Sequence, residues 1–131
     1  MARRRGIDVL RRRAVEFLEG AEEALKAGRY GLACFLSEQA VQLYVKSKLL
    51  ELVGDYPRTH YIRVLLGELL RSIDDERLRR FIRDNRVRIS SLEDAYLMAR
   101  YSEKEYFRED AEDAVSLARE LIKLIERLQQ P

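Results

Sequence analysis

The strongest constraint on the fold is a long apolar segment that runs from Tyr30 to Leu52. It predicts one helix that ends at Gly54 and is roughly 35 Å long, given a rise of about 1.5 Å per residue. Apolar side chains cover more than half of its circumference instead of forming one stripe. Such a helix lies either at the centre of a bundle or at a contact between subunits. The rest of the chain is therefore expected to pack around it.

The 131 residues predict a single domain, 1–131, which is long enough to build a core without disulfides. Cys34, the only cysteine, lies inside the apolar pattern and is expected to be a small buried side chain. No apolar run approaches the ~18 residues that span a bilayer, and the N-terminus lacks the apolar core of a secretory signal. We therefore expect a cytoplasmic protein, with residues 1–7 as a candidate for a disordered basic N-terminus.

Arginine is unusually frequent and unevenly distributed. Six arginines lie in the first thirteen residues and six more lie between Asp75 and Ser90, although the net charge is only +2. The excess of arginine over lysine fits a GC-rich genome, a hot habitat or phosphate-binding surfaces, and the sequence does not separate these. For the second cluster, Arg77–Arg88, a solvated helix face is favoured over a nucleic-acid site.

The spacing of apolar residues predicts further helices and no strand of convincing length. They are expected at about Asp8–Lys26, Thr59–Ile73, Asp75–Asp84, Ser90–Arg100 and Arg108–Leu128, with a loop at Asn85–Ile89. Asp8 and Thr59 are expected N-caps, and Ser90 with Glu93 has the form of a capping box. The predicted fold is an all-α, up-and-down bundle of four main helices with a short additional helix.

Several kinds of site are excluded by the residues present. One histidine and one cysteine cannot make a typical zinc site, and there is no P-loop. No serine lies in an elbow-type motif of the kind that acyl-transfer enzymes use. The sequence therefore predicts neither a metal nor a cofactor.

His60, the only histidine, follows a proline turn and lies in the first turn of the predicted third helix, between Arg58 and Tyr61. Backbone N–H groups and the positive end of a helix favour a neutral imidazole there. His60 is either a binding residue, together with Arg58, or a turn histidine that a neighbouring carbonyl or carboxylate satisfies.

Arg100 lies at the end of a predicted short helix, between Tyr96 and Tyr101. An arginine flanked by aromatic rings can clamp a phosphate and support a stacked base. The alternative is a structural arginine that pairs with Glu103 or Glu105.

Segments distributed over nearly the whole chain, in the same order, resemble the HEPN domain family. They are Phe17–Leu25, Tyr30–Leu50, Thr59-His60 followed by Leu65-Leu66, and Leu92–Tyr96 followed by Ala99-Arg100-Tyr101. The resemblance implies a small helical bundle, usually a homodimer, often encoded beside a minimal nucleotidyltransferase. It also implies binding of nucleotides or RNA, and many such proteins are metal-independent ribonucleases, some of them toxins of toxin–antitoxin pairs.

The ribonuclease branch of that family has an arginine and a histidine separated by four to six residues. For His60 that arginine would replace Val53, Gly54 or Asp55, and Arg58 is too close to it. The catalytic motif of that branch is therefore absent as written. The Arg100-Tyr101 pair is instead similar to the archaeal-type, nucleotidyltransferase-associated branch.

Three functions follow from these observations, and the first is preferred. The first is a homodimeric module that binds nucleotide or RNA through Arg100, with His60, Arg58, Tyr96 and Tyr101 as further contacts, and that acts with a minimal nucleotidyltransferase in a toxin–antitoxin-like pair. The second is a metal-independent ribonuclease in which His60 is the acid or base and Arg100 stabilises the charged phosphorane. The third is a purely structural dimerising protein. On balance, catalysis is not expected.

Overall fold

The computed structural model describes residues 2–128, so Met1 and residues 129–131 of the predicted domain lie outside the described part. Within residues 2–128 there are six helices and no strand: α1 (Ala2–Lys26), α2 (Tyr30–Val53), α3 (Ile62–Ile73), α4 (Glu76–Asp84), α5 (Arg86–Tyr101) and α6 (Arg108–Glu126). The predicted all-α bundle is confirmed: α4 and α5 correspond to the expected helices at Asp75–Asp84 and Ser90–Arg100, so two helices accompany the four main ones where the predicted fold had a single short one. None of the described helices combines the length and the apolar character that crossing a bilayer requires.

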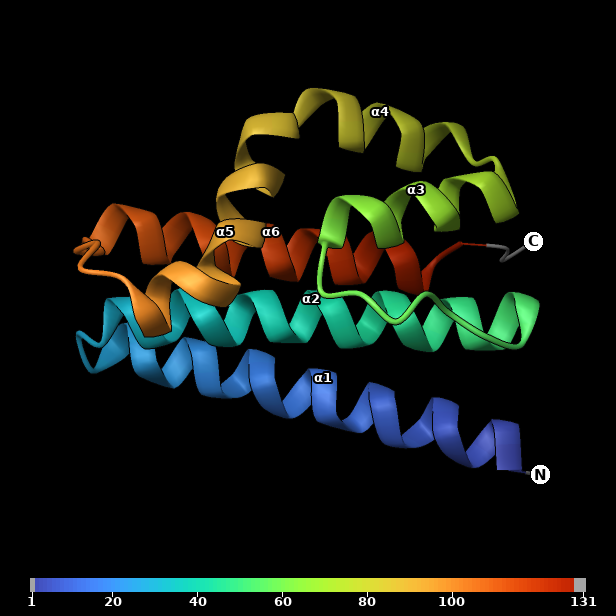
Figure 1. The fold of residues 1–131 in the computed structure, drawn as a ribbon, viewed down its shortest axis with the longest axis horizontal. Coiled ribbons are helices and arrows are strands. Elements are labelled where there is room, and N and C mark those ends of the chain that lie inside the picture. The colour runs from blue at the N-terminus through green and yellow to red at the C-terminus, as the bar shows by residue number, and fades with distance from the viewer. Residues whose placement is uncertain (1, 129–131) are drawn as a thin grey trace.

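The predicted central helix corresponds to α2, which contacts α1, α3, α5 and α6. Figure 1 shows α1 running alongside α2, with α6 on another side and α3 and α4 stacked farther from α1. Neighbours from the same chain therefore cover the broad apolar surface of α2. Of the two explanations for that surface, the central place in a bundle is the one that the fold realises.

The first helix is longer than predicted, because α1 begins at Ala2 and not at Asp8. Asp8 is exposed within the helix and is no N-cap. The extra turns are held by the end of α2: Arg3 Nε and Nη2 donate to the carbonyl oxygens of Leu50 at 3.0 Å and Glu51 at 2.6 Å. Gly6 permits this close approach, since a Cβ at Gly6 would lie 3.2 Å from Leu50 Cδ2.

The connection between α2 and α3 begins as predicted and ends differently. Gly54 adopts φ 84° and donates its N–H to the Leu50 carbonyl at 3.1 Å, which closes α2 with a left-handed residue. Thr59 is no helix cap, since α3 begins at Ile62, and Thr59 Oγ1 instead accepts the N–H of Tyr61 at 3.1 Å. His60 therefore lies in the connection before α3 and not in the first turn of the helix.

The region after α3 is more helical than its sequence predicted. Asp75 caps α4 by accepting the N–H groups of Arg77 at 2.8 Å and Leu78 at 3.2 Å. The predicted loop at Asn85–Ile89 is wrong, because α5 begins directly after Asn85. The predicted capping box is wrong for the same reason, since Ser90 lies inside α5.

Glu93, the other half of that predicted box, caps a different helix. Its buried carboxylate accepts the backbone N–H of Arg63 at 3.0 Å, near the N-terminus of α3. It also accepts Nε and Nη2 of the Arg63 guanidinium at 3.1 and 2.6 Å. A side chain from α5 thus supplies the N-terminal cap that the α3 sequence lacks.

Candidate functional site

The structure brings together four of the five predicted site residues, His60, Tyr96, Arg100 and Tyr101. His60 comes from the connection between α2 and α3, and the other three come from the C-terminal end of α5. The Tyr96 ring links them. The His60 ring stacks on it with centroids 4.2 Å apart and an interplanar angle of 7°, and the Arg100 guanidinium lies 4.6 Å from its centroid.

Arg100 is exposed and is held by three aromatic rings. Its guanidinium carbon lies 4.6 Å from the centroids of Tyr96 and Tyr101 and 4.9 Å from that of Phe35, on α2. Nε donates to the Tyr96 carbonyl at 2.8 Å, and Nη1 donates to the Tyr101 hydroxyl at 3.2 Å. The aromatic faces and these two acceptors fix the orientation of the guanidinium.

The positive charge of Arg100 is not neutralised by an ion pair with any carboxylate in residues 2–128, and the predicted alternatives, Glu103 and Glu105, do not bind it. A guanidinium carries five N–H donors, and two of them are used here. The remaining donors can bind an anion from solution. A phosphate is the anion whose shape matches this planar fork.

His60 is fixed by ring contacts and not by hydrogen bonds. Its ring also lies 4.3 Å from that of Tyr61, and its Nε2 is buried without a hydrogen-bond partner among the described residues. For Nε2, this is not the turn histidine of the alternative interpretation, which a neighbouring carbonyl or carboxylate would satisfy. Because Nε2 is shielded from solvent, this geometry favours a positioning role for His60 over proton transfer to a ligand.

Arg58 lies in a different cluster from the other predicted site residues. Its guanidinium lies 4.5 Å from the centroid of Tyr56, and its Nη1 is 3.3 Å from Oδ1 of Asp55. Lys46 Nζ lies 5.5 Å from the same Tyr56 centroid. The sequence placed Arg58 beside His60, but its side chain contacts Tyr56 and Asp55.

Glu38 is a site residue that the sequence did not reveal. It lies on α2 one turn after Phe35 and is completely buried. Gln39 Nε2 and Gln42 Nε2 donate to its two carboxylate oxygens at 2.8 Å each. Burial raises the pKa of Glu38 to about 7, and the two glutamines, Lys46 and Arg100 oppose that rise. No local pattern marks this carboxylate, because a glutamate within a helix usually faces solvent.

The second predicted basic cluster is largely neutralised by acidic neighbours. Arg77 pairs with Asp75 at 3.1 Å, Arg83 pairs with Asp84 at 3.0 Å, and Arg79 pairs with Asp74 and Glu76. Arg88 pairs with Asp113 at 2.7 Å and Glu120 at 3.2 Å. These ion pairs support the solvated-face interpretation of this segment over a nucleic-acid site.

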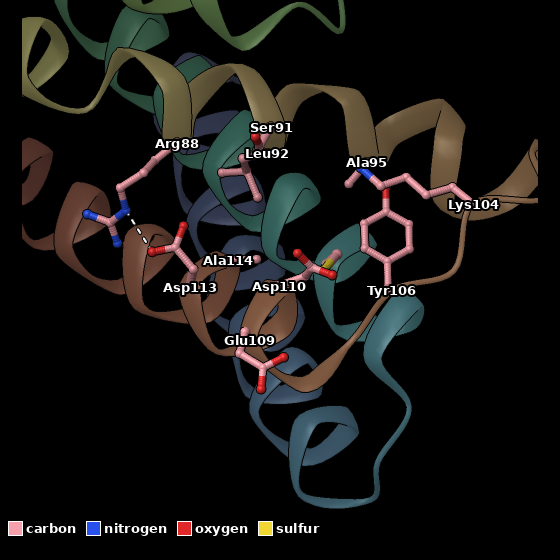
Figure 2. Close-up of a pocket in the computed structure, with 11 residues that line it drawn as sticks. Arg88, Ser91, Leu92, Ala95, Lys104, Tyr106, Glu109, Asp110, Asp113 and Ala114 are labelled. Carbon is pink, nitrogen blue, oxygen red and sulfur yellow. Dashed lines mark hydrogen bonds and ion pairs between the residues drawn. The ribbon is translucent and has the colours of Figure 1, made fainter.

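A separate pocket of about 180 Å³ lies between α2, α5 and the start of α6 (Figure 2). The ion pair between Arg88 and Asp113 closes one side of it, and Tyr106 lines another. Cys34 lines the pocket and is buried as predicted, and burial raises the pKa of its thiol to about 12. Such a thiol is a poor nucleophile at neutral pH. The pocket contains none of the predicted site residues.

No group of three or more His, Cys, Asp or Glu side chains in residues 2–128 could hold a metal ion. The site itself offers an exposed guanidinium, a shielded imidazole and aromatic rings.

Comparison with known proteins gives the following similarities. The model of the family described as "HEPN domain" matches residues 7–128. The crystal structure of TT1696 from Thermus thermophilus is 26% identical with a TM-score of 0.78, and the match covers 92% of this chain and 96% of that one. The structure of ST0689, an archaeal HEPN homologue, is 25% identical with a TM-score of 0.66, and the match covers 92% and 94%. No curated protein sequence matches the chain.

Proposed function

Because this chain belongs to the HEPN domain family, we propose that it is a binding module for the phosphate groups of a nucleotide or of RNA. The observation that carries the proposal is the exposed Arg100 guanidinium, which three aromatic rings orient and no carboxylate in residues 2–128 neutralises. Arg100 binds the phosphate, the exposed Tyr101 offers a stacking surface, and His60 positions Tyr96. The cytoplasm, which holds both RNA and nucleotides, is the compartment proposed.

The proposed active form is a homodimer. Large apolar side chains that are 39–50% exposed lie at the start of α3 and on the adjacent part of α5, and they are Tyr61, Val64, Leu97 and Met98. His60, Tyr61, Leu97 and Met98 line one shallow groove of about 250 Å³. A second copy that covers this face would remove the apolar surface from water. The proposed dimer contact therefore adjoins the phosphate site.

The proposed partner is a minimal nucleotidyltransferase, in a toxin–antitoxin-like pair. Its support is the family membership and the similarity of Arg100-Tyr101 to the nucleotidyltransferase-associated branch. Co-expression of the two proteins followed by size-exclusion chromatography tests it. Separate elution at micromolar concentrations would count against the pair.

Phosphate binding is tested by titrating ATP, and separately a fluorescein-labelled single-stranded RNA of eight nucleotides, into the purified protein at low salt. We expect Arg100→Ala to weaken binding about tenfold or more, because a charge-assisted bidentate contact is lost. Arg80→Ala is the matched control, since Arg80 is an exposed arginine on α4, away from the site. Equal affinities of wild type, Arg100→Ala and Arg80→Ala would contradict the proposal.

A ribonuclease is the competing function, and the same variants separate it from binding. Total RNA is incubated with wild type, His60→Ala and Arg100→Ala in EDTA, which removes any contribution of divalent metal. We expect no cleavage by any of the three, since the Nε2 atom of His60 is shielded. Cleavage by wild type alone would make His60 and Arg100 catalytic and would replace the binding proposal.

A further inference from the structure

A second cationic and aromatic group, here called the Tyr56 cluster, consists of Lys46, Tyr56 and Arg58. Both cations lie over the Tyr56 ring, with Lys46 Nζ at 5.5 Å and the Arg58 guanidinium at 4.5 Å from its centroid. Arg5, from the first turns of α1, lines an adjoining groove of about 370 Å³ together with Tyr56. Two cationic side chains therefore meet at one aromatic ring, and a third, Arg5, lines the groove beside it.

The positive charge of this cluster is only weakly compensated. An ion pair joins Arg58 to Asp55 at 3.3 Å, and the two side chains are 72% and 76% exposed, so water and salt screen the pair. Lys46 also donates to Gln42 Oε1 at 2.9 Å, but that amide oxygen carries no net charge. Burial lowers the pKa of Lys46, the carboxylate of Glu38 opposes that shift, and repulsion by Arg58 adds to it. Two cations held together in this way are stabilised when an anion binds between them.

The Tyr56 cluster and the Arg100 site lie on the same face of α2. Phe35, which supports Arg100, and Lys46 are eleven residues apart on α2. Eleven residues make about three complete helical turns, so the two side chains point in nearly the same direction about 16 Å apart along the axis. Glu38, which lies between them in sequence, interacts electrostatically with both Lys46 and Arg100.

The connection between α2 and α3 joins the two groups on the surface. It runs back along α2 from the C-terminal end toward the middle of that helix (Figure 1). Along it come Tyr56, then Arg58, then His60, which stacks on Tyr96 beside Arg100. The connection thus leads from the Tyr56 cluster to the Arg100 site at the end of α5.

We propose that the Tyr56 cluster is a second phosphate subsite and that the two subsites together bind a single-stranded oligonucleotide. This inference rests on the phosphate-binding function proposed above and adds the class of ligand. The phosphates of a mononucleotide lie at one end of the molecule, so it cannot reach both subsites, whereas a strand of several nucleotides can. Tyr101, which is 72% exposed and lies outside the proposed dimer face, offers a ring face for an unpaired base along that path.

The length of the bound strand is the measurement that tests this inference. Oligouridylates of two and eight nucleotides are compared by fluorescence anisotropy, the shorter one as a competitor, with wild type and with the double variant Lys46→Gln/Arg58→Ala. We expect wild type to bind the octamer at least about tenfold more tightly than the dimer. The double variant should bind the eight-nucleotide strand about tenfold more weakly, while its affinity for the two-nucleotide strand stays within about twofold of wild type. Its affinity for the eight-nucleotide strand should also depend less steeply on salt concentration.

The controls separate a failure of this inference from a failure of the proposed function. Arg80→Ala/Arg86→Ala removes two exposed arginines of α4 and α5 and should leave both affinities unchanged. Thermal melting checks that each variant is folded, and Arg58→Glu serves as a second variant at the cluster.

Unchanged octamer affinity in both cluster variants, with binding by Arg100→Ala still weakened, overturns the second subsite and leaves the phosphate site at Arg100 supported. If wild type binds an eight-base-pair duplex as tightly as the single-stranded octamer, the single-strand assignment is overturned. If wild type binds none of the probes, both proposals are overturned.

Discussion

At the scale of single residues, the choice of arginine at position 100 follows from its surroundings. A guanidinium is planar and weakly hydrated, so it can lie against aromatic rings and still donate hydrogen bonds in its own plane. Phe35, Tyr96 and Tyr101 provide such rings around Arg100. An ammonium group would stay hydrated and would lack the fixed fork. The local structure therefore orients a charged group without neutralising it.

Glu38 should make folding stability depend on pH in a specific range. Its pKa is about 7 in the folded protein, against an ordinary value of 4.5, so the folded state binds more protons between these values than the unfolded state. The contribution of Glu38 to stability is therefore present below about pH 4.5 and is lost as pH rises toward 7. At about 1.4 kcal/mol per pH unit, the loss is at most roughly 3 kcal/mol.

Urea unfolding at pH 5 and pH 8 measures this effect. We expect Glu38→Gln to lose less stability than wild type between the two pH values, since the substituted side chain does not titrate. Glu112→Gln, at an exposed position of α6, should behave like wild type. The same pH dependence in all three proteins would show that Glu38 is ionised in the folded state at pH 5.

Gly67 offers a direct route to a more stable protein. It lies exposed within α3, and a Cβ added there would meet no atom within 4 Å. Gly67→Ala should therefore raise the free energy of unfolding by about 0.5–1 kcal/mol through helix propensity alone. Gly20→Ala is the comparison, because a Cβ at Gly20 would lie 3.3 Å from Leu36 Cδ1 and crowding would offset the gain. Urea titration at pH 7 measures both, and a destabilised Gly67→Ala protein would contradict the argument.

At the scale of elements, the start of α3 depends on a residue of α5. Glu93→Ala removes the carboxylate that accepts the Arg63 backbone N–H and its guanidinium. We expect a loss of about 1–3 kcal/mol in the free energy of unfolding, because a helix cap and a buried charged hydrogen bond disappear together. Asp94→Ala, the exposed neighbour, should cost much less. Chemical denaturation of the two variants compares them, and equal losses would mean that Glu93 is no cap.

The same element shows why some boundaries could not be predicted. Ser90 and Glu93 have the spacing of a capping box, but Glu93 finds its partner thirty residues away in sequence, on α3. Asn85 was expected to open a loop, yet its side chain donates to the Phe81 carbonyl and accepts from Arg88, which joins α4 to α5. Likewise, α1 gains its first turns from Arg3 contacts with α2. Local patterns predicted which segments are helical, and long-range polar contacts decided where those helices begin.

The site was predictable to a similar extent. Its identity as an arginine between tyrosines near a histidine follows from sequence, and His60, Tyr96 and Arg100 do come together. Phe35 and Glu38 were not predictable as site residues, because on a helix that is apolar over most of its surface they look like any other residue of the core or of an exposed face. Only the packing of α5 against α2 gives them their roles.

At the scale of the whole molecule, the proposed dimer can be tested without any ligand. Light scattering coupled to gel filtration should give a mass of twice 15.4 kDa for wild type. Leu97→Asp places a charge in the exposed apolar face of α3 and α5 and should yield a monomer. Val87→Asp is the matched control, since Val87 is 78% exposed on the same helix but lies near its other end. A monomeric wild type would contradict the proposed dimer. A Leu97→Asp variant that is still dimeric would show that the contact lies on another surface.

The central position of α2 also predicts which amide hydrogens of the molecule exchange fastest and which exchange slowest. Its backbone amides are surrounded by α1, α3, α5 and α6, so exposing them to deuterated water requires nearly global opening. Helix α4 contacts only α3, α5 and α6 among the described elements, through few residues, and should exchange its amide hydrogens by local fraying. The slowest hydrogen exchange should therefore follow α2. The Arg100 and Tyr56 groups both rest on α2, so they should keep their spacing while the outer layer of the bundle fluctuates.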